Sequence, residues 1–181
     1  MTSHLSLHTA PTAGFDEPFE MLLACHQRVL RMLDLLQRLG AHLAAKGSDD
    51  EARQAARDVM RYFDTAGPAH HEDEERHLFP VLLAQGAPDR LALVQRLHQD
   101  HLAMTQAWHA IRGDLQSVLD GQLPGLEVAR ARWQQFADLY TGHIRAEEDE
   151  AYPAAEADLS PPSLQAMGQE MASRRGVTPG A

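Results

Sequence analysis

Apolar residues recur every three to four positions along four long stretches of the chain, and no other feature constrains the fold as strongly. In the first stretch, from Glu17 to about Leu43, they form one continuous stripe. Such a stripe is buried when the stretch forms an amphipathic helix. Short loops between helices place consecutive helices side by side. We therefore predict an all-α fold, an antiparallel up-down-up-down four-helix bundle with a short C-terminal helix.

Capping and turn-forming residues give the predicted helix boundaries. Ser48 to Glu51 has the Ser-x-x-Glu form of a capping box, which predicts the start of the second helix. Gly67-Pro68 interrupts that helix, but the apolar stripe resumes in register beyond it, so we expect a kink rather than an end. The third helix is predicted from Pro88 to about Asp120, the fourth fades after Pro153, and a short fifth helix covers 163–174.

Length, charge and cysteine content narrow the function classes. A chain of 181 residues suits one domain. We expect a flexible lead-in at 1–14, the bundle at 15–158, and a short helix and tail at 159–181. The formal net charge of −10 disfavours nucleic acid and anionic membranes as partners. Cys25 is the single cysteine, so no intramolecular disulfide can form, and the N-terminal residues lack a secretory signal pattern. These features predict a cytoplasmic protein.

Two segments of the chain resemble each other. Residues 70–80 align without gaps to residues 143–153, and both read His-x-x-x-Glu-Glu-x-x-x-aromatic-Pro. A further histidine on an apolar stripe precedes each segment: His26 lies 44 residues before the first and His101 lies 42 residues before the second. The chain therefore looks like two copies of a helical hairpin, which we expect around an approximate two-fold axis.

The spacing within each copy points to a metal site. Residues four apart lie on one face of a helix, so each His-x-x-x-Glu aims an imidazole and a carboxylate at one point. Buried carboxylates are costly unless they are paired or bind a metal. Two ions bridged by both glutamates would offset that cost, and imidazole with carboxylate suits iron, and also manganese or zinc. The candidate ligands on the core stripes are His26, His70, Glu74, His101, His143 and Glu147.

This pattern resembles the hemerythrin-like HHE cation-binding family over roughly residues 15–155. The most specific element is the segment from His70 to Pro80, close to the family signature His-x-x-x-Glu-Glu-x-x-Leu-Phe-Pro. The resemblance implies a non-haem site of two iron ions, Fe2+ or Fe3+, with an oxo or hydroxo bridge as one arrangement. It also implies that the six candidate residues are the ligands.

The chain departs from the oxygen-carrying hemerythrins at two places. Those proteins have a second histidine four residues from the first on the third helix, where this chain has Leu97 and Thr105 around His101. They also have an aspartate five residues after the last histidine, whereas Glu147 lies four residues after His143. These departures argue against reversible oxygen transport, and we favour a metal-binding protein over a dedicated enzyme. Its expected partner is a small diatomic molecule or peroxide, for sensing, detoxification, or iron handling and repair.

The remaining histidines receive weaker predictions. His77 shares a helix face with His70 and either assists the site or, as we favour, caps the core layer beneath it. His98 lies three residues from the third-helix ligand and could approach the site. His71 points about 100° away from the ligand face and is predicted to face solvent, as is His109.

Other residues near the ligands are expected to act indirectly. Glu75 and Glu148 point off the ligand face, so contact with the ligands or with solvent is expected rather than metal binding. Tyr140 and Trp108 are predicted to pack in the core. Cys25 lies on a helix beside His26, where a buried thiol is ordinarily inert.

Two alternatives from other classes remain open. A ferritin-like di-iron oxidase uses Glu-x-x-His from two helices. Glu74 and His77 fit that pattern once, but the second copy has Glu150 in place of the histidine. A purely structural or partner-binding helical domain predicts that chelators leave thermal stability unchanged, whereas a metal-binding domain melts at a lower temperature without its metal.

Overall fold

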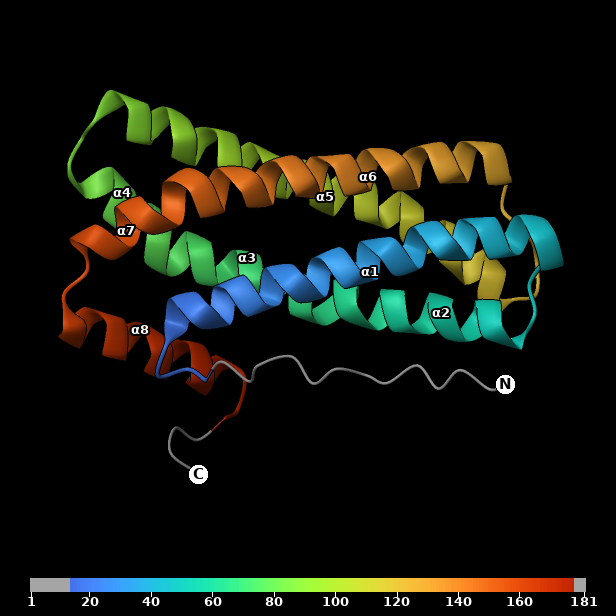
Figure 1. Ribbon diagram of the computed structural model, residues 1–181, viewed down its shortest axis with the longest axis horizontal. Coiled ribbons are helices and arrows are strands. Elements are labelled where there is room, and N and C mark those ends of the chain that lie inside the picture. The colour runs from blue at the N-terminus through green and yellow to red at the C-terminus, as the bar shows by residue number, and fades with distance from the viewer. Residues whose placement is uncertain (1–13, 178–181) are drawn as a thin grey trace, which may run out of the picture.

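The computed structural model describes residues 14–177, which are helical apart from short connections and contain no strand. The predicted lead-in lies, apart from Gly14, outside the described residues. The elements form four long helical segments and a shorter helix. The long segments run along one another, and the shorter helix lies at one end (Figure 1). The segments are α1 (Pro18–Lys46); α2 (Asp50–Arg61), η1 (Tyr62–Ala66), α3 (Gly67–Asp73), η2 (Glu74–Leu78) and α4 (Phe79–Ala84); α5 (Pro88–Leu119); and α6 (Leu126–Ala146), η3 (Glu147–Ala151) and α7 (Tyr152–Asp158), followed by α8 (Pro161–Arg174).

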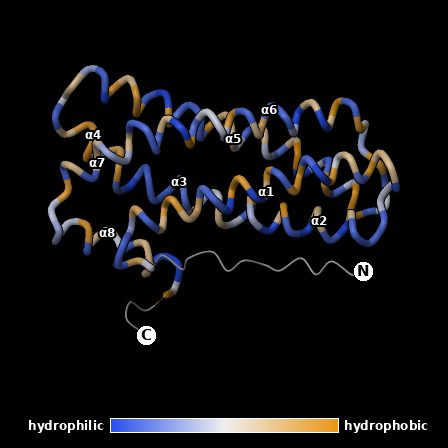
Figure 2. The backbone as a smooth tube through the Cα atoms, in the orientation of Figure 1, coloured by the Kyte–Doolittle hydropathy of each residue, from blue (hydrophilic) through white to orange (hydrophobic). Residues whose placement is uncertain are grey.

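Each long segment packs against two others and encloses a shared core. Helices α1 and α5 both contact α2 and α6, so the four segments surround one interior. Hydrophobic and hydrophilic residues alternate along each segment (Figure 2). Two apolar clusters fill this interior. One contains Val29 and Met104, and the other contains Leu22 and Leu97. Along α1 and α5 the residues between these pairs include His26 and His101, so the apolar interior is divided by a polar layer.

Three π-helical turns, η1, η2 and η3, each end two residues before a proline: Pro68, Pro80 and Pro153. A proline has no backbone N–H and its ring crowds the carbonyl one turn earlier. A widened turn before the proline relieves this conflict without ending the helix. The helix therefore continues through Gly67-Pro68, as predicted, and the expected kink takes the form of a π-helical turn. Two of these turns begin at predicted ligands, Glu74 and Glu147.

The predicted capping box at the start of α2 is wrong by one residue. Asp49 is the N-cap, and its side chain accepts a hydrogen bond from the Ala52 N–H at 2.9 Å. The hydroxyl of Ser48 instead donates to the Val118 carbonyl at 2.6 Å and ties this loop to the end of α5. His42 also contacts the capping carboxylate at 2.8 Å. The carboxylate of Asp49 therefore serves to cap the helix.

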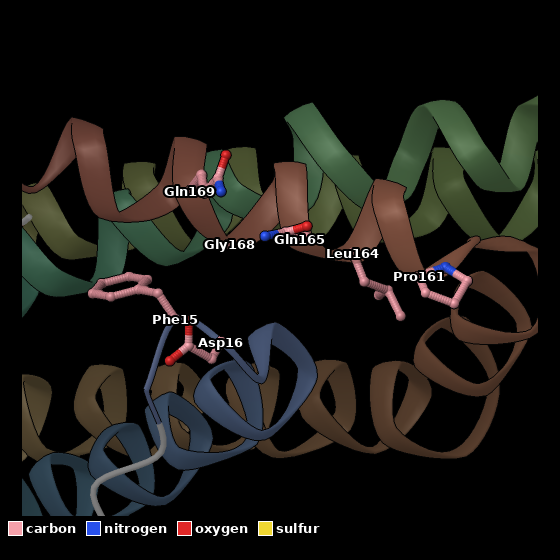
Figure 3. Close-up of a pocket in the computed structure, with 7 residues that line it drawn as sticks. All are labelled: Phe15, Asp16, Pro161, Leu164, Gln165, Gly168 and Gln169. Carbon is pink, nitrogen blue, oxygen red and sulfur yellow. The ribbon is translucent and has the colours of Figure 1, made fainter. Parts of the chain in front are cut away.

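Helix α8 begins two residues earlier than predicted and docks against α3. Asp73 is fully buried and accepts hydrogen bonds from Arg174 and from both terminal nitrogens of Arg175, the latter at 3.0 and 2.5 Å. On its other side α8 meets the segment before α1, where a methyl group at Gly168 would overlap the Phe15 carbonyl oxygen. Figure 3 shows the hollow of about 400 Å³ beside this contact, which no histidine lines. Among the described residues no helix is long and apolar enough to cross a membrane.

Candidate metal centre

The six predicted ligand residues lie together in the polar layer of the bundle. They come from all four long segments, and none is more than 3% exposed. The two glutamates are the first residues of the π-helical turns η2 and η3. The carbonyl of Glu74 accepts from the Phe79 N–H and that of Glu147 from the Tyr152 N–H, five residues on in each case. The two halves of the site are therefore built in the same way, as the internal repeat predicts.

The ligand atoms form two groups, and both glutamates belong to both groups. In each group one atom per residue lies within 4.8 Å of the corresponding atom of every other member. This is the arrangement that two neighbouring ions need if carboxylates bridge them. Both groups contain Glu74 and Glu147; the first, which we call the His26/His70 half, adds those two histidines, and the second, the His101/His143 half, adds the other two.

Unpaired buried atoms show that the donor set fits cations. Both ring nitrogens of His70, Oε2 of Glu74 and both carboxylate oxygens of Glu147 are buried without a hydrogen-bond partner among the described residues. Buried polar atoms without partners are rare because each costs about 1–3 kcal/mol, and more when charged. Cations between the carboxylates and imidazoles would satisfy these carboxylate oxygens and Nε2 of His70, which lies 3.3 Å from Oε1 of Glu74.

The distances agree with that fit. Nε2 of His143 lies 2.9 Å from Oε1 of Glu147 and 3.1 Å from Nε2 of His101, and Nε2 of His26 lies 3.1 Å from Oε2 of Glu147. Nitrogens that bind one transition-metal ion at about 2.0–2.1 Å lie about 3–3.4 Å apart. Two imidazole nitrogens that face each other at this separation are therefore spaced like ligands of one ion.

Acidic residues outside these groups orient three of the imidazoles. Nδ1 of His26 lies 2.9 Å from Oε1 of Glu148, and Nδ1 of His101 lies 2.8 Å from Oε1 of Glu75. Hydrogen bonding at Nδ1 leaves Nε2 free to bind a metal and raises its basicity. Glu75 and Glu148 thus contact the imidazoles, as expected, and do not belong to the ligand groups. Asp100 makes the corresponding contact with Nδ1 of His143 at 3.3 Å.

Comparison with known proteins shows the family of this chain. A family model described as the hemerythrin HHE cation binding domain matches residues 17–155. The chain belongs to this family. It is also 30% identical over 165 residues to a protein of Haemophilus influenzae described only as uncharacterized, a match that covers 91% of this chain and 94% of that protein. The chain is thus a hemerythrin-like, metal-binding domain.

Electrostatics in this hemerythrin-like domain favour bound cations. Burial opposes ionisation of Glu147, but the imidazoles of His143 and His26 outweigh it and hold the pKa of the carboxyl well below its usual range. Burial likewise opposes charge on His101, yet Glu74 and Glu75 raise its pKa to about 9. These shifts favour a charged carboxylate on Glu147 and a protonated imidazole on His101 at neutral pH. Binding of a metal at His101 must displace that proton.

Two aromatic rings flank the site in equivalent positions, and one was missed as a functional candidate. Tyr152 stacks on His26 with ring centroids 5.3 Å apart, and Phe79 stacks on His101 with centroids 5.7 Å apart. The hydroxyl of Tyr152 donates to Oε1 of Glu74 at 2.5 Å and lies 3.0 Å from Nε2 of His26. These rings occupy the aromatic position of the repeat, so the alignment could have identified the tyrosine. For Asp100 no spacing signal exists, because its reach depends on how α5 packs on α6.

The prediction that His71 faces solvent is wrong. Its side chain is only 9% exposed and stacks on His101 with ring centroids 4.0 Å apart and planes 8° apart. A residue 100° from the ligand face meets solvent on an isolated helix, but in this bundle that direction meets α5 and α6. Burial and the charge of His101 lower the pKa of His71 well below its ordinary value.

The other predictions for nearby residues have mixed outcomes. His77 contacts Glu170 of α8 at 2.6 Å and does not belong to the ligand groups. His98 is exposed and does not approach the site, and His109 is exposed, as expected. Tyr140 is in the core and Trp108 packs against it. Cys25 is buried, and burial raises the pKa of its thiol.

Proposed function

We propose that this hemerythrin-like domain binds two iron ions and through them engages dioxygen, peroxide or nitric oxide. The observation that carries the proposal is the pair of ligand groups that share two buried glutamates, three of whose four carboxylate oxygens have no hydrogen-bond partner among the described residues. The proposal takes the long segments as an antiparallel up-down-up-down bundle, which the short loops support. It also takes the protein as cytoplasmic, since a single free cysteine suits a reducing compartment.

The donor set supports iron and an exchangeable small molecule. Each half offers two imidazoles together with the two shared carboxylates, and this mixture suits iron, with manganese or zinc as possible substitutes. One atom from each residue gives about four protein donors per ion, fewer than an octahedral ion takes. When bound, an iron pair supplies electron transfer and open positions for a small molecule.

The protein residues hold this chemistry in place. Glu148 and Glu75 fix the orientation of His26 and His101 through Nδ1. The apolar clusters on both sides of the polar layer exclude bulk water. The hydroxyl of Tyr152 lies beside the His26/His70 half, where it can hold or pass a proton at Oε1 of Glu74. These arrangements support binding and redox response more than turnover of a large substrate.

Metal analysis of single-residue variants tests the proposal. Protein purified under iron-replete conditions should hold about two irons per chain. Glu147→Ala should lower the content below one because both groups share this residue, whereas His70→Ala should retain about one. Glu150→Ala removes an exposed carboxylate from the same π-helical turn and should leave the content unchanged.

A reactivity measurement completes the test. The loaded protein would be reduced without oxygen and then exposed to oxygen or nitric oxide, while the absorption of the iron centre is followed. A stable spectral change indicates a carrier or sensor, and rapid bleaching with oxidation indicates redox turnover. Less than about one metal per chain, zinc alone under iron-replete conditions, or an inert spectrum would count against the proposal.

A further inference from the structure

His71 is a buried imidazole for which the six-ligand site has no use. Its Nε2 is buried and has no hydrogen-bond partner within residues 14–177. Its ligand atom lies within 4.8 Å of those of His101 and His143. The equivalent residue of the other copy is Ile144, which has no polar group. The His101/His143 half therefore carries a polar side chain that the His26/His70 half lacks.

The stacking of His71 disfavours direct metal binding. An imidazole binds an ion in the plane of its ring. The rings of His71 and His101 are nearly parallel, with planes 8° apart and centroids 4.0 Å apart. An ion in the plane of His101 therefore lies well outside the plane of His71. The ring of Tyr140 lies beyond His71, with centroids 5.9 Å apart and planes 25° apart, and helps to hold this orientation.

A small cavity connects His71 to the surface. Its volume is about 60 Å³, several times the roughly 10–15 Å³ that one water needs. Pro68 and Thr105 line its exposed end, whereas the buried side chains of Phe63 and Met104 line its interior together with His71. The cavity therefore has a mainly apolar wall and an imidazole at its inner end, which suits a small uncharged molecule better than an ion.

We propose that this cavity admits a small uncharged molecule, of the class of dioxygen, nitric oxide or hydrogen peroxide, to the His101/His143 half, where Nε2 of His71 forms a hydrogen bond with it. This rests on the proposed function, because it names the half of the site at which the small molecule is held. His71 is thus a binding residue for that molecule, and the cavity is its route.

Replacement of His71 by the residue of the other copy tests the hydrogen bond. His71→Ile keeps an apolar side chain of the type already found at position 144, and His98→Ala is the control because His98 is exposed. Iron-loaded protein would be titrated with nitric oxide without oxygen. Loss of one hydrogen bond should speed nitric oxide dissociation about tenfold. The N–O stretching frequency should shift in the variant only, and the iron content should stay at about two per chain.

The route is tested separately with xenon, which binds in apolar cavities. Metal-free full-length protein should show a bound xenon signal by NMR, and Thr105→Met, which fills the cavity mouth, should remove it. In the iron-loaded protein the same variant should slow nitric oxide association several-fold. Since the xenon measurement needs no iron, it still reports on the cavity if the protein fails to bind iron.

Three results would overturn the inference. Unchanged nitric oxide dissociation and stretching frequency in His71→Ile would show that this imidazole does not touch the molecule. A fall to one iron per chain in that variant would make His71 a metal ligand instead. No xenon signal in the unmodified protein would remove the route. Absence of iron from the unmodified protein would instead contradict the proposed function.

Discussion

Replacement of Tyr152 by phenylalanine should weaken the metal-free protein more than the metal-loaded one. Its hydroxyl donates a hydrogen bond to Oε1 of Glu74, a fully buried residue. Phenylalanine fits such a position, since Phe79 occupies the equivalent place over His101 in the other half. Tyr152→Phe therefore removes one interaction with little change in packing.

The expected magnitude follows from the charge and burial of Glu74. A hydrogen bond to a charged group contributes about 1.5–3 kcal/mol. For a chain of this size, about 1 kcal/mol changes the melting temperature by about 2–4 °C. The metal-free variant should therefore melt about 3–12 °C lower. When cations occupy the carboxylate oxygens, the hydroxyl contributes less, so the loaded variant should melt close to the unmodified protein.

Linkage turns this difference into an affinity. A change that destabilises the metal-free fold more than the loaded fold must strengthen metal binding by the same free energy. The variant should therefore bind metal about tenfold more tightly, or more. Thermal melts with and without metal, together with a chelator-competition titration, measure both quantities.

Tyr62→Phe is the matched control for this variant. The hydroxyl of Tyr62 donates to the Cys25 carbonyl at 3.3 Å, outside the metal centre. This variant should lose at most about 1 kcal/mol, equally in both states. The reasoning would be refuted if Tyr152→Phe left the metal-free protein unchanged and lost metal, because the hydroxyl would then act on the bound ions instead of competing with them.

Three further predictions concern the helix α8 contacts and the polar layer. Gly168→Ala should destabilise the protein by about 1–3 kcal/mol in a denaturant titration, because its methyl group overlaps the Phe15 backbone. Gly113 has open space around it, so Gly113→Ala should stabilise the protein by up to about 1 kcal/mol in the same titration. Asp73→Ala should cost about 3 kcal/mol, because it breaks a buried ion pair with the partly exposed arginines of α8, and limited proteolysis should then cut this helix sooner. The raised pKa of His101 means that its proton stabilises the metal-free fold fully below pH 6.5 and that this stability is lost as the pH rises through about 9. Metal binding must displace this proton, so indicator titrations should show proton release between these pH values and affinity that falls with falling pH.

The sequence predicted the features that depend on periodicity. A stripe of apolar residues is a local property, so the helical segments and their loops follow from it, and the start of α5 at Pro88 agrees with prediction. The sequence does not distinguish Ser48 from Asp49 as the cap of α2, because both residues are good caps and only the contact of Ser48 with the end of α5 separates them. The start of η2 at Glu74 could not be read from a helical period of 3.6 residues.

Contacts between helices limited the prediction of the site. The six candidate ligands share the stripes that define the core, so their convergence follows from the same periodicity. His71 and Asp100 lie off those stripes, and their positions depend on which neighbouring helix each one meets. The contact of His77 with Glu170 could not be predicted from the repeat, because it comes from α8, a helix with no counterpart in the repeat.

The internal repeat explains why the site is symmetric, and its exceptions explain why the two halves cannot be equivalent. The ligands, the π-helical turns that begin at Glu74 and Glu147, and the stacked aromatic rings all occur twice. At the aromatic position, however, the His26/His70 half has a tyrosine whose hydroxyl contacts the carboxylate, whereas the other half has Phe79. The position that follows His70 in the first copy and His143 in the second holds His71 and Ile144, respectively. His71 lines a cavity open to solvent. In the His26/His70 half the hydroxyl of Tyr152 therefore contacts a ligand residue, whereas in the His101/His143 half His71 faces a route to the surface. Small-molecule exchange is thus expected at the His101/His143 half, and the Tyr152 hydroxyl is expected to lower metal affinity through its hydrogen bond to Glu74.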